Sequence, residues 1–190
     1  MGSEERFEVA LYDLLVVVGL LQPGEMGATI GNALVAAGRE VLWASEGRSE
    51  ASHARAEKFT DVGSVADVAA RAEVVFSVVP PHAALETAEA LAGYAGIYVD
   101  ANAIAPATAR EVGSRFARFV DGGIIGGPPD PHLYLSGEEA ATVAALFAGS
   151  PVDAHVTSNA SALKCAYAGW SKGSAALLLA MRAYAERACV

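Results

Sequence analysis

Two glycines in the segment Gln22–Gly27 have the spacing to bind a phosphate. The segment reads Gln-Pro-Gly-Glu-Met-Gly, follows an apolar run, Leu15–Leu20, and opens an amphipathic stretch. Gly24 would let the backbone approach a pyrophosphate, and Gly27 would let a helix pack close against the strand. The helix N-terminus adds free N–H groups and the positive end of its dipole. An ordinary helix-start turn is the alternative, because Gln22 stands where Gly-x-Gly-x-x-Gly begins with glycine.

This turn predicts a dinucleotide site. The residues that we expect to contact the cofactor here are Leu21, Gln22, Pro23, Gly24, Glu25, Met26 and Gly27.

Further phosphate-binding groups follow a second predicted strand, Val41–Ala44. An acidic side chain at this tip would bind the 2′-hydroxyl of NAD, whereas arginine favours the 2′-phosphate of NADP. The strand ends without a carboxylate, and Ser45, Arg48 and Ser49 then offer hydroxyls and a guanidinium. Glu46 opposes a phosphate, and a solvated charge at a helix start is the alternative role for Arg48. The sequence favours NADP over NAD.

Lys164 is suited to acid–base chemistry. Partial desolvation lowers the pKa of a lysine toward neutrality, where the amine can exchange a proton at the operating pH. An ammonium beside a reacting carbonyl would also stabilise developing negative charge. The alternative is a lysine whose stem lies on an apolar helix while its charge reaches solvent. Its apolar neighbours in the sequence are Ala162, Leu163, Ala166 and Tyr167.

The elements that must position these residues alternate between strand and helix. This alternation predicts an α/β fold, a Rossmann-type doubly wound and mostly parallel sheet, followed by a long C-terminal helix from Ser158. The predicted strands are Leu15–Leu20, Val41–Ala44, Glu73–Val79, Ile97–Asp100, Phe119–Asp121, His132–Ser136 and Val152–Val156. The predicted helices before Ser158 are 26–37, 49–59, 64–71, 82–92, 106–117 and 138–147.

Three segments follow from this order. We expect residues 1–14 to be a disordered extension and 15–157 to be a dinucleotide-binding Rossmann domain. Residues 158–190 are expected to be a long interdomain helix that starts a truncated or missing helical domain, with Trp170 and Tyr184 as packing residues.

Composition narrows the class of protein. A formal charge of −9 argues against a nucleic-acid partner. The apolar run 14–21 is much shorter than the roughly 20 residues of a membrane-spanning helix, so no membrane partner is expected. Cys165 and Cys189 lie far apart in a long sequence that shows no secretory signal, so we expect no disulfide framework and a reducing, cytoplasmic compartment. The four histidines show no metal-ligand spacing, so no metal site is predicted.

Taken jointly and in order, five segments resemble the β-hydroxyacid dehydrogenase superfamily, which holds 6-phosphogluconate dehydrogenase, 3-hydroxyisobutyrate dehydrogenase and imine reductases. The turn and the Ser-Ala-Leu-Lys sequence are most similar to a poorly characterised branch with its own type of C-terminal domain. The five segments are Val18–Gly27, Phe76–Pro81, Tyr98–Pro106, Val120–Gly127 and Ser161–Lys164.

The resemblance implies roles for individual residues. Val79 and Pro80 would lie along the dinucleotide, and Asn102 would lie near the nicotinamide ribose. Lys164 would be the general acid or base for the substrate oxygen during hydride transfer.

Two departures from the family bear on the substrate. The resemblance implies that Ile125, Gly126 and Gly127 line the substrate pocket, but hydroxyacid dehydrogenases usually carry serine where Ile125 stands. Isoleucine cannot donate a hydrogen bond to a substrate carboxylate. Hydroxyacid dehydrogenases of the family also carry asparagine one turn after the lysine, where this sequence has Ala168. The adjacent Tyr167 offers a hydroxyl instead. A small hydroxy acid is therefore disfavoured, and a bulkier or less polar substrate fits better.

These features predict an NAD(P)-dependent oxidoreductase that transfers hydride to or from a carbon bearing oxygen or nitrogen. NADP is the expected cofactor. The expected partners are a small-molecule substrate and a second copy, bound through the C-terminal helix as a homodimer. The alternative is a non-catalytic NADP-binding module or pseudoenzyme, and a weaker one is a flavin-type reductase on a similar fold.

Overall fold

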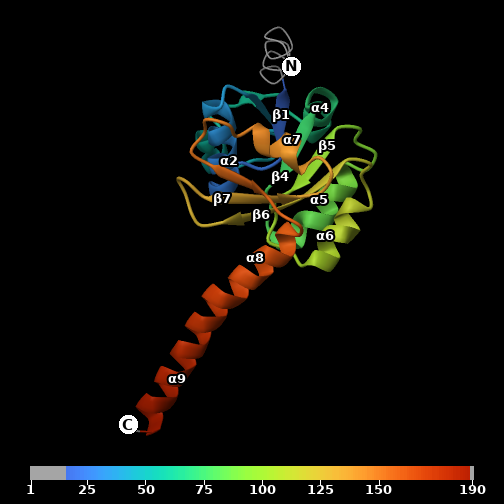
Figure 1. Cartoon of the computed structure of the whole chain (residues 1–190). Coiled ribbons are helices and arrows are strands. Elements are labelled where there is room, and N and C mark those ends of the chain that lie inside the picture. The colour runs from blue at the N-terminus through green and yellow to red at the C-terminus, as the bar shows by residue number, and fades with distance from the viewer. Residues whose placement is uncertain (1–15, 189–190) are drawn as a thin grey trace.

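An eight-stranded sheet forms the centre of the chain (Figure 1), whose computed structural model describes residues 16–188. The strand order is β3-β2-β1-β4-β5-β6-β7-β8, and only the β6–β7 pair is antiparallel. The expected extension 1–14 lies outside the described residues. The strands are β1 (Val17–Leu20), β2 (Glu40–Trp43), β3 (Thr60–Asp61), β4 (Val74–Ser77), β5 (Ile97–Asp100), β6 (Phe119–Ile125), β7 (His132–Ser136) and β8 (Asp153–Val156).

Helices cover both faces of the sheet, so the predicted doubly wound, mostly parallel α/β fold is confirmed. The alternation of buried strand residues divides the core, because Val74 and Phe76 face one layer while Val75 faces the other. Helices α2 and α7 pack on the first layer, and α4, α5 and α6 pack on the second (Figure 1). The helices are α2 (Glu25–Ala36), α3 (Glu50–Arg55), α4 (Val65–Arg71), η1 (Pro81–Ala83), α5 (Ala84–Ala90), α6 (Pro106–Gly113), α7 (Ala140–Ala145), α8 (Ala160–Ala168), η2 (Gly169–Gly173) and α9 (Ser174–Ala188).

Helix α2 lies close to the turn that precedes it and to Phe59. A Cβ atom on Gly27 would lie 2.2 Å from the backbone oxygen of Gln22, and one on Gly31 would lie 2.5 Å from the ring of Phe59. Both distances are too short for any real Cβ contact. These two glycines therefore set how tightly the helix packs behind the turn.

The last helical segments extend away from the sheet (Figure 1). Helix α8 continues through η2, a π-helical turn, into α9, as the predicted long helix requires. Trp170 and Tyr184 are each 75% exposed, so the expectation that they pack is wrong within residues 16–188. The physical reason is that the helix leaves the sheet after α8. None of the helices in this described range has the length and apolar character needed to cross a bilayer.

The structure also differs from the predicted strands. Strand β3 was not expected, because its two residues are too short to give a periodic signal. Strand β6 continues to Ile125 rather than ending at Asp121, since Gly122 and Gly123 weaken the strand pattern that they belong to. This extension carries β6 alongside α8, where the candidate site forms.

Candidate functional site

The carboxyl ends of three central parallel strands meet at one edge of the sheet. Strand β1 is followed by the glycine turn, β4 by Val79 and β5 by Asn102. Ligands of doubly wound sheets bind at this edge, at the point where strand order reverses. Here the order reverses between β1 and β4, beside the turn that the sequence singled out.

The turn presents an open backbone surface. Gly24 is the N-cap of α2 and makes no side-chain cap, and a Cβ atom built on it meets nothing within 4 Å. The space beside Gly24 is therefore open, and the first N–H groups of an α-helix have no partner within the helix and can bind an anion. Arg55 Nε donates to the oxygen of Pro23 at 2.8 Å, and Arg48 Nη2 donates to the oxygen of Leu21 at 3.1 Å. Sequence reasoning missed Arg55, whose contact across 32 residues leaves no local signal.

The hydroxyls predicted to bind a 2′-phosphate already have partners. Ser49 Oγ caps α3 by accepting from Ser52 N at 3.3 Å. Ser45 donates to Asp61, and hydrogen bonds from Gly63 N and then from Ser45 lower the pKa of that carboxyl. Arg48 differs, because its buried Nε has no partner among the described residues. Of the three predicted groups, Arg48 keeps a free donor.

Asn102 joins the loops that follow β4 and β5. Its Oδ1 accepts from Val79 N at 2.6 Å, while its Nδ2 donates to Ser77 Oγ and to Asp100 Oδ2, both at 3.0 Å. Asp100 Oδ1 also accepts from Asn102 N at 3.0 Å. Both polar atoms of the Asn102 side chain are thus hydrogen-bonded, and the amide holds the loop at Val79 against the end of β5.

Lys164 lies on α8 directly above β6. Its Nζ donates to the backbone oxygen of Ile124 and lies 5.9 Å from the ring centroid of Tyr167. Desolvation by burial lowers the pKa of Lys164, and the charge of Lys172 lowers it further. The direction agrees with the expectation from its apolar neighbours, and the effect of Lys172 had no counterpart in the sequence reasoning.

Two cavities meet at Lys164. One, of about 170 Å³, is lined by Lys164 together with Met26, Val79 and Asn102. The other, of about 250 Å³, is lined by Lys164 and Tyr167. A residue of the first cavity, Val79, also lines a third of about 290 Å³ that reaches Leu21, Gln22 and Arg48. The three cavities follow the edge of the sheet from Arg48 to Lys164.

Other predicted residues lie apart from these cavities. Pro80 is exposed ahead of η1, and Glu25 is exposed in the first turn of α2. Ile125 ends β6, and the exposed Gly126 and Gly127 follow it. None of these three lines a cavity that Lys164 lines, whereas their neighbour Ile124 does.

Asp121 anchors the helix that carries Lys164, and sequence reasoning missed it. Its Oδ2 accepts from Ser161 N at 2.8 Å and from Ser136 Oγ at 3.2 Å. Ser136 Oγ accepts in turn from Ala160 N at 3.0 Å. The first N–H groups of α8 are therefore satisfied by side chains of β6 and β7.

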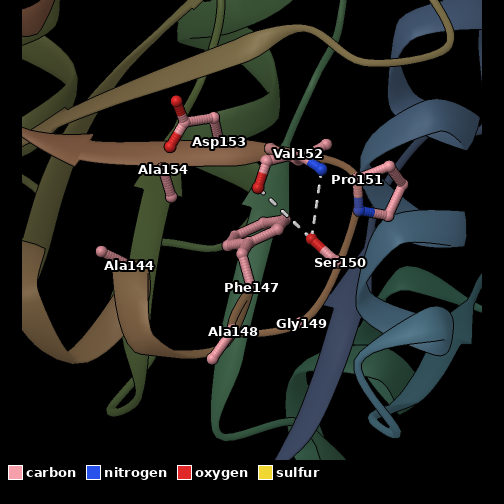
Figure 2. Close-up of a pocket in the computed structure, with 9 residues that line it drawn as sticks. All are labelled: Ala144, Phe147, Ala148, Gly149, Ser150, Pro151, Val152, Asp153 and Ala154. Atoms are coloured by element: carbon pink, nitrogen blue, oxygen red, sulfur yellow. Dashed lines mark hydrogen bonds between the residues drawn. The ribbon is translucent and has the colours of Figure 1, made fainter.

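A further pocket lies far from this chemistry, between the end of α7 and β8 (Figure 2). There Ser150 Oγ accepts from Val152 N at 3.2 Å and donates to Val152 O at 3.4 Å. The hydroxyl is used in shaping its own loop, so this pocket is not a candidate active site.

The buried carboxyl of Asp100, which holds Asn102, should make the stability of the protein depend on pH. Burial raises the pKa of Asp100 to about 6, so the folded state holds this proton more tightly than the unfolded state does. The stability contributed by protonation is fully present below about pH 4 and is lost as pH rises to about 6. We expect the free energy of unfolding of the parent, relative to Asp100→Asn, to fall by up to about 3 kcal/mol across this window. Urea unfolding at several pH values measures it, and parallel profiles would contradict the assignment.

Comparisons with known proteins find similarity in both sequence and fold. Residues 17–103 match a family model described as NADP oxidoreductase, coenzyme F420-dependent. The conserved protein MTH1747, whose structure is described as similar to 3-hydroxyacid dehydrogenases, is 32% identical with a TM-score of 0.76, over 90% of this chain and 70% of that one. No curated protein matches the chain.

Two other structures share the fold. A conserved hypothetical protein from Sinorhizobium meliloti is 23% identical with a TM-score of 0.73, over 93% of this chain and 66% of that one. A reductive aminase from Aspergillus terreus, in complex with NADPH and ethyl levulinate, is 19% identical with a TM-score of 0.73, over 93% and 68%. The chain thus spans about two thirds of the length of these relatives. It belongs to the β-hydroxyacid dehydrogenase-like superfamily, and its sheet is the pyridine-nucleotide-binding fold of that superfamily.

Proposed function

We propose that this chain is the cofactor-binding part of an NADP-dependent oxidoreductase that transfers hydride to or from a carbon bearing oxygen or nitrogen. One observation carries the proposal. Lys164 lines both the cavity that reaches Val79 and Asn102 and the cavity that contains Tyr167. The proposed proton donor, Lys164, thus lies beside the proposed dinucleotide groove.

The residues present fit a dinucleotide. Gly24 leaves open space at the N-terminus of α2, and the buried Nε of Arg48 lacks a partner among residues 16–188. The helix N-terminus would hold the pyrophosphate, and Val79 and Asn102 would border the nicotinamide end. When bound, the cofactor supplies or accepts the hydride.

The preference for NADP rests on Arg48. A guanidinium with a free donor suits a 2′-phosphate, whereas the hydroxyls of Ser45 and Ser49 would have to exchange their present partners. Asp61, which holds Ser45, opposes a phosphate by its charge. Arg48 is therefore the side chain that should decide between the two cofactors.

Lys164 would hold and move the proton. Its lowered pKa brings the amine closer to the operating pH, where a general acid or base is most effective. The backbone oxygen of Ile124 orients the amine by accepting one of its hydrogens. Two further hydrogens of the ammonium remain for a substrate oxygen or nitrogen.

The surroundings favour a substrate of low polarity. Pro81, Ala103 and Ala168 contribute apolar surface to the cavity that holds Lys164 and Tyr167. Ile125 offers no donor for a carboxylate. We therefore propose a ketone, imine or bulkier hydroxy compound rather than a small hydroxy acid, with Tyr167 as the second polar contact.

We also propose that α9 pairs with a second copy of the chain. Leu177, Leu178, Leu179 and Met181 are each more than 60% exposed on this helix. Large apolar side chains that gather exposed on one helix favour an interaction site. Sedimentation equilibrium would give the mass of a dimer, and a monomer at every concentration would contradict the proposal.

Replacing Arg48 tests the cofactor preference. We expect Arg48→Ala to weaken NADPH binding about tenfold to a hundredfold, because a charge-assisted contact to the 2′-phosphate is lost, and to weaken NADH binding much less, through the lost contact to Leu21 O alone. Fluorescence titration with each cofactor measures this. Arg71→Ala, an exposed arginine at the end of α4, is the matched control. Equal losses for both cofactors, or tighter binding of NADH by the parent, would refute the preference for NADP.

Replacing Lys164 tests the catalytic proposal. Lys164→Met keeps the length of the side chain and removes its charge, so kcat should fall by about 10² to 10⁴ while NADPH affinity barely changes. Turnover is measured as loss of NADPH absorbance with a panel of ketones and imines, and as gain of NADPH absorbance when NADP+ is supplied with hydroxy acids.

Lys58→Met is the control, because Lys58 is an exposed lysine between α3 and β3. Lys172 is unsuitable for this purpose, since its charge influences Lys164. Full turnover by Lys164→Met would make the lysine structural. Tight NADPH binding by a parent that turns over none of the panel would instead favour a non-catalytic binding module.

A further inference from the structure

Two histidines and an aspartate converge on the last two strands of the sheet. His132 begins β7, and Asp153 and His155 lie on β8. The parallel register pairs His132 with Asp153 and Tyr134 with His155. Side chains at alternate positions of paired strands share a face, so the fold gathers these groups although 23 residues separate the histidines. The sequence spacing gave no sign of this cluster.

The donor atoms of the cluster lie close together in space. His132 Nδ1 is 3.3 Å from His155 Nε2 and 3.4 Å from Asp153 Oδ2. His155 Nε2 is 2.9 Å from the same Asp153 oxygen. One atom from each residue therefore forms a small triangle, rather than three side chains that merely share a surface.

The triangle has the size of one face of a zinc coordination tetrahedron. Zinc binds histidine nitrogen at about 2.0–2.1 Å and carboxylate oxygen at about 2.0–2.2 Å, so tetrahedral ligands lie about 3.3 Å apart. Two of the three distances match this value, and the His155–Asp153 pair would need to open by a few tenths of an ångström. Imidazole nitrogen with one carboxylate also suits zinc and neighbouring transition metals, whereas magnesium and calcium prefer oxygen alone.

The surroundings leave room for an ion. The three side chains are between 40% and 61% exposed, so a cation can reach the donors without a change of fold. The ring of Tyr134 stacks on His155 with centroids 5.1 Å apart and limits how that imidazole can turn. Neutral imidazoles can point these two nitrogens at a metal while their other ring nitrogens carry hydrogen.

We propose that His132, Asp153 and His155 bind one divalent transition-metal ion of the zinc class. Three protein ligands leave a fourth position for water or another small ligand. The bound ion would tie β8 to β7 at the end of the sheet where β7 pairs with Ile125 of β6. This site uses none of the residues assigned above to the dinucleotide or to proton transfer.

The test is metal binding by the untagged chain after dialysis against a chelator. Isothermal titration with Zn²⁺ should give one saturable site per chain, and Co²⁺ should give the visible absorption bands of a tetrahedral nitrogen and oxygen site. His155→Ala and His132→Ala should each abolish that site and its bands. His82→Ala, an exposed histidine on η1, should retain both.

Circular dichroism of each variant shows whether the fold is intact, and we expect it to be, since none of the three side chains is buried. The proposal is overturned if the parent binds no Zn²⁺ at a defined stoichiometry. It is equally overturned if His155→Ala binds as tightly as the parent, or if Mg²⁺ competes as well as Zn²⁺ does. Neither result would bear on the role of Lys164.

Discussion

The position of Lys164 depends on the close contact between α8 and β6. A Cβ atom on Gly123 would lie 2.9 Å from the backbone oxygen of Ala160 and 3.2 Å from the Cβ of Lys164. Only glycine therefore lets the helix lie this near the strand. Asp121, two residues earlier, holds the helix start by accepting from Ser161 N. Strand β6 thus provides both the space, at Gly123, and the hydrogen bond, from Ser161 N to Asp121, that place Lys164 at the edge of the sheet.

Two neighbouring carboxylates organise the two halves of the site. Asp100 and Asp121 are paired in register on β5 and β6. Asp100 fixes Asn102 and through it the loop at Val79, which borders the dinucleotide groove. Asp121 fixes α8 and therefore Lys164. Burial is the largest cause of the raised pKa of Asp100, and the charge of Asp121 raises it further. Burying these two carboxylates costs free energy, and their hydrogen bonds offset that cost while they hold the loop at Val79 and helix α8 in place.

The sequence predicted the parts of the molecule that carry local patterns. Alternating elements gave the doubly wound sheet, and the turn at Gly24 placed the start of α2. The antiparallel course of β7 and the length of β6 were missed, because strand direction and the continuity of a strand through Gly122 are set by tertiary packing.

The site divides in the same way. Lys164, Asn102 and Arg48 belong to recognisable segments, and the structure brings them to one edge, while their roles remain predictions. The sequence did not predict roles for Asp121 and Arg55, because each hydrogen-bonds to a partner that is distant in sequence. No periodicity of a single segment reports such contacts.

We infer that one groove runs from the N-terminus of α2 to Lys164 and holds a single dinucleotide. A crystal structure of the complex with NADPH tests it most directly. We expect the pyrophosphate at the backbone of Gly24, and the nicotinamide ring in the cavity lined by Met26, Asn102 and Lys164. A dinucleotide bound elsewhere, or a nicotinamide ring out of reach of the Lys164 amine, would contradict it.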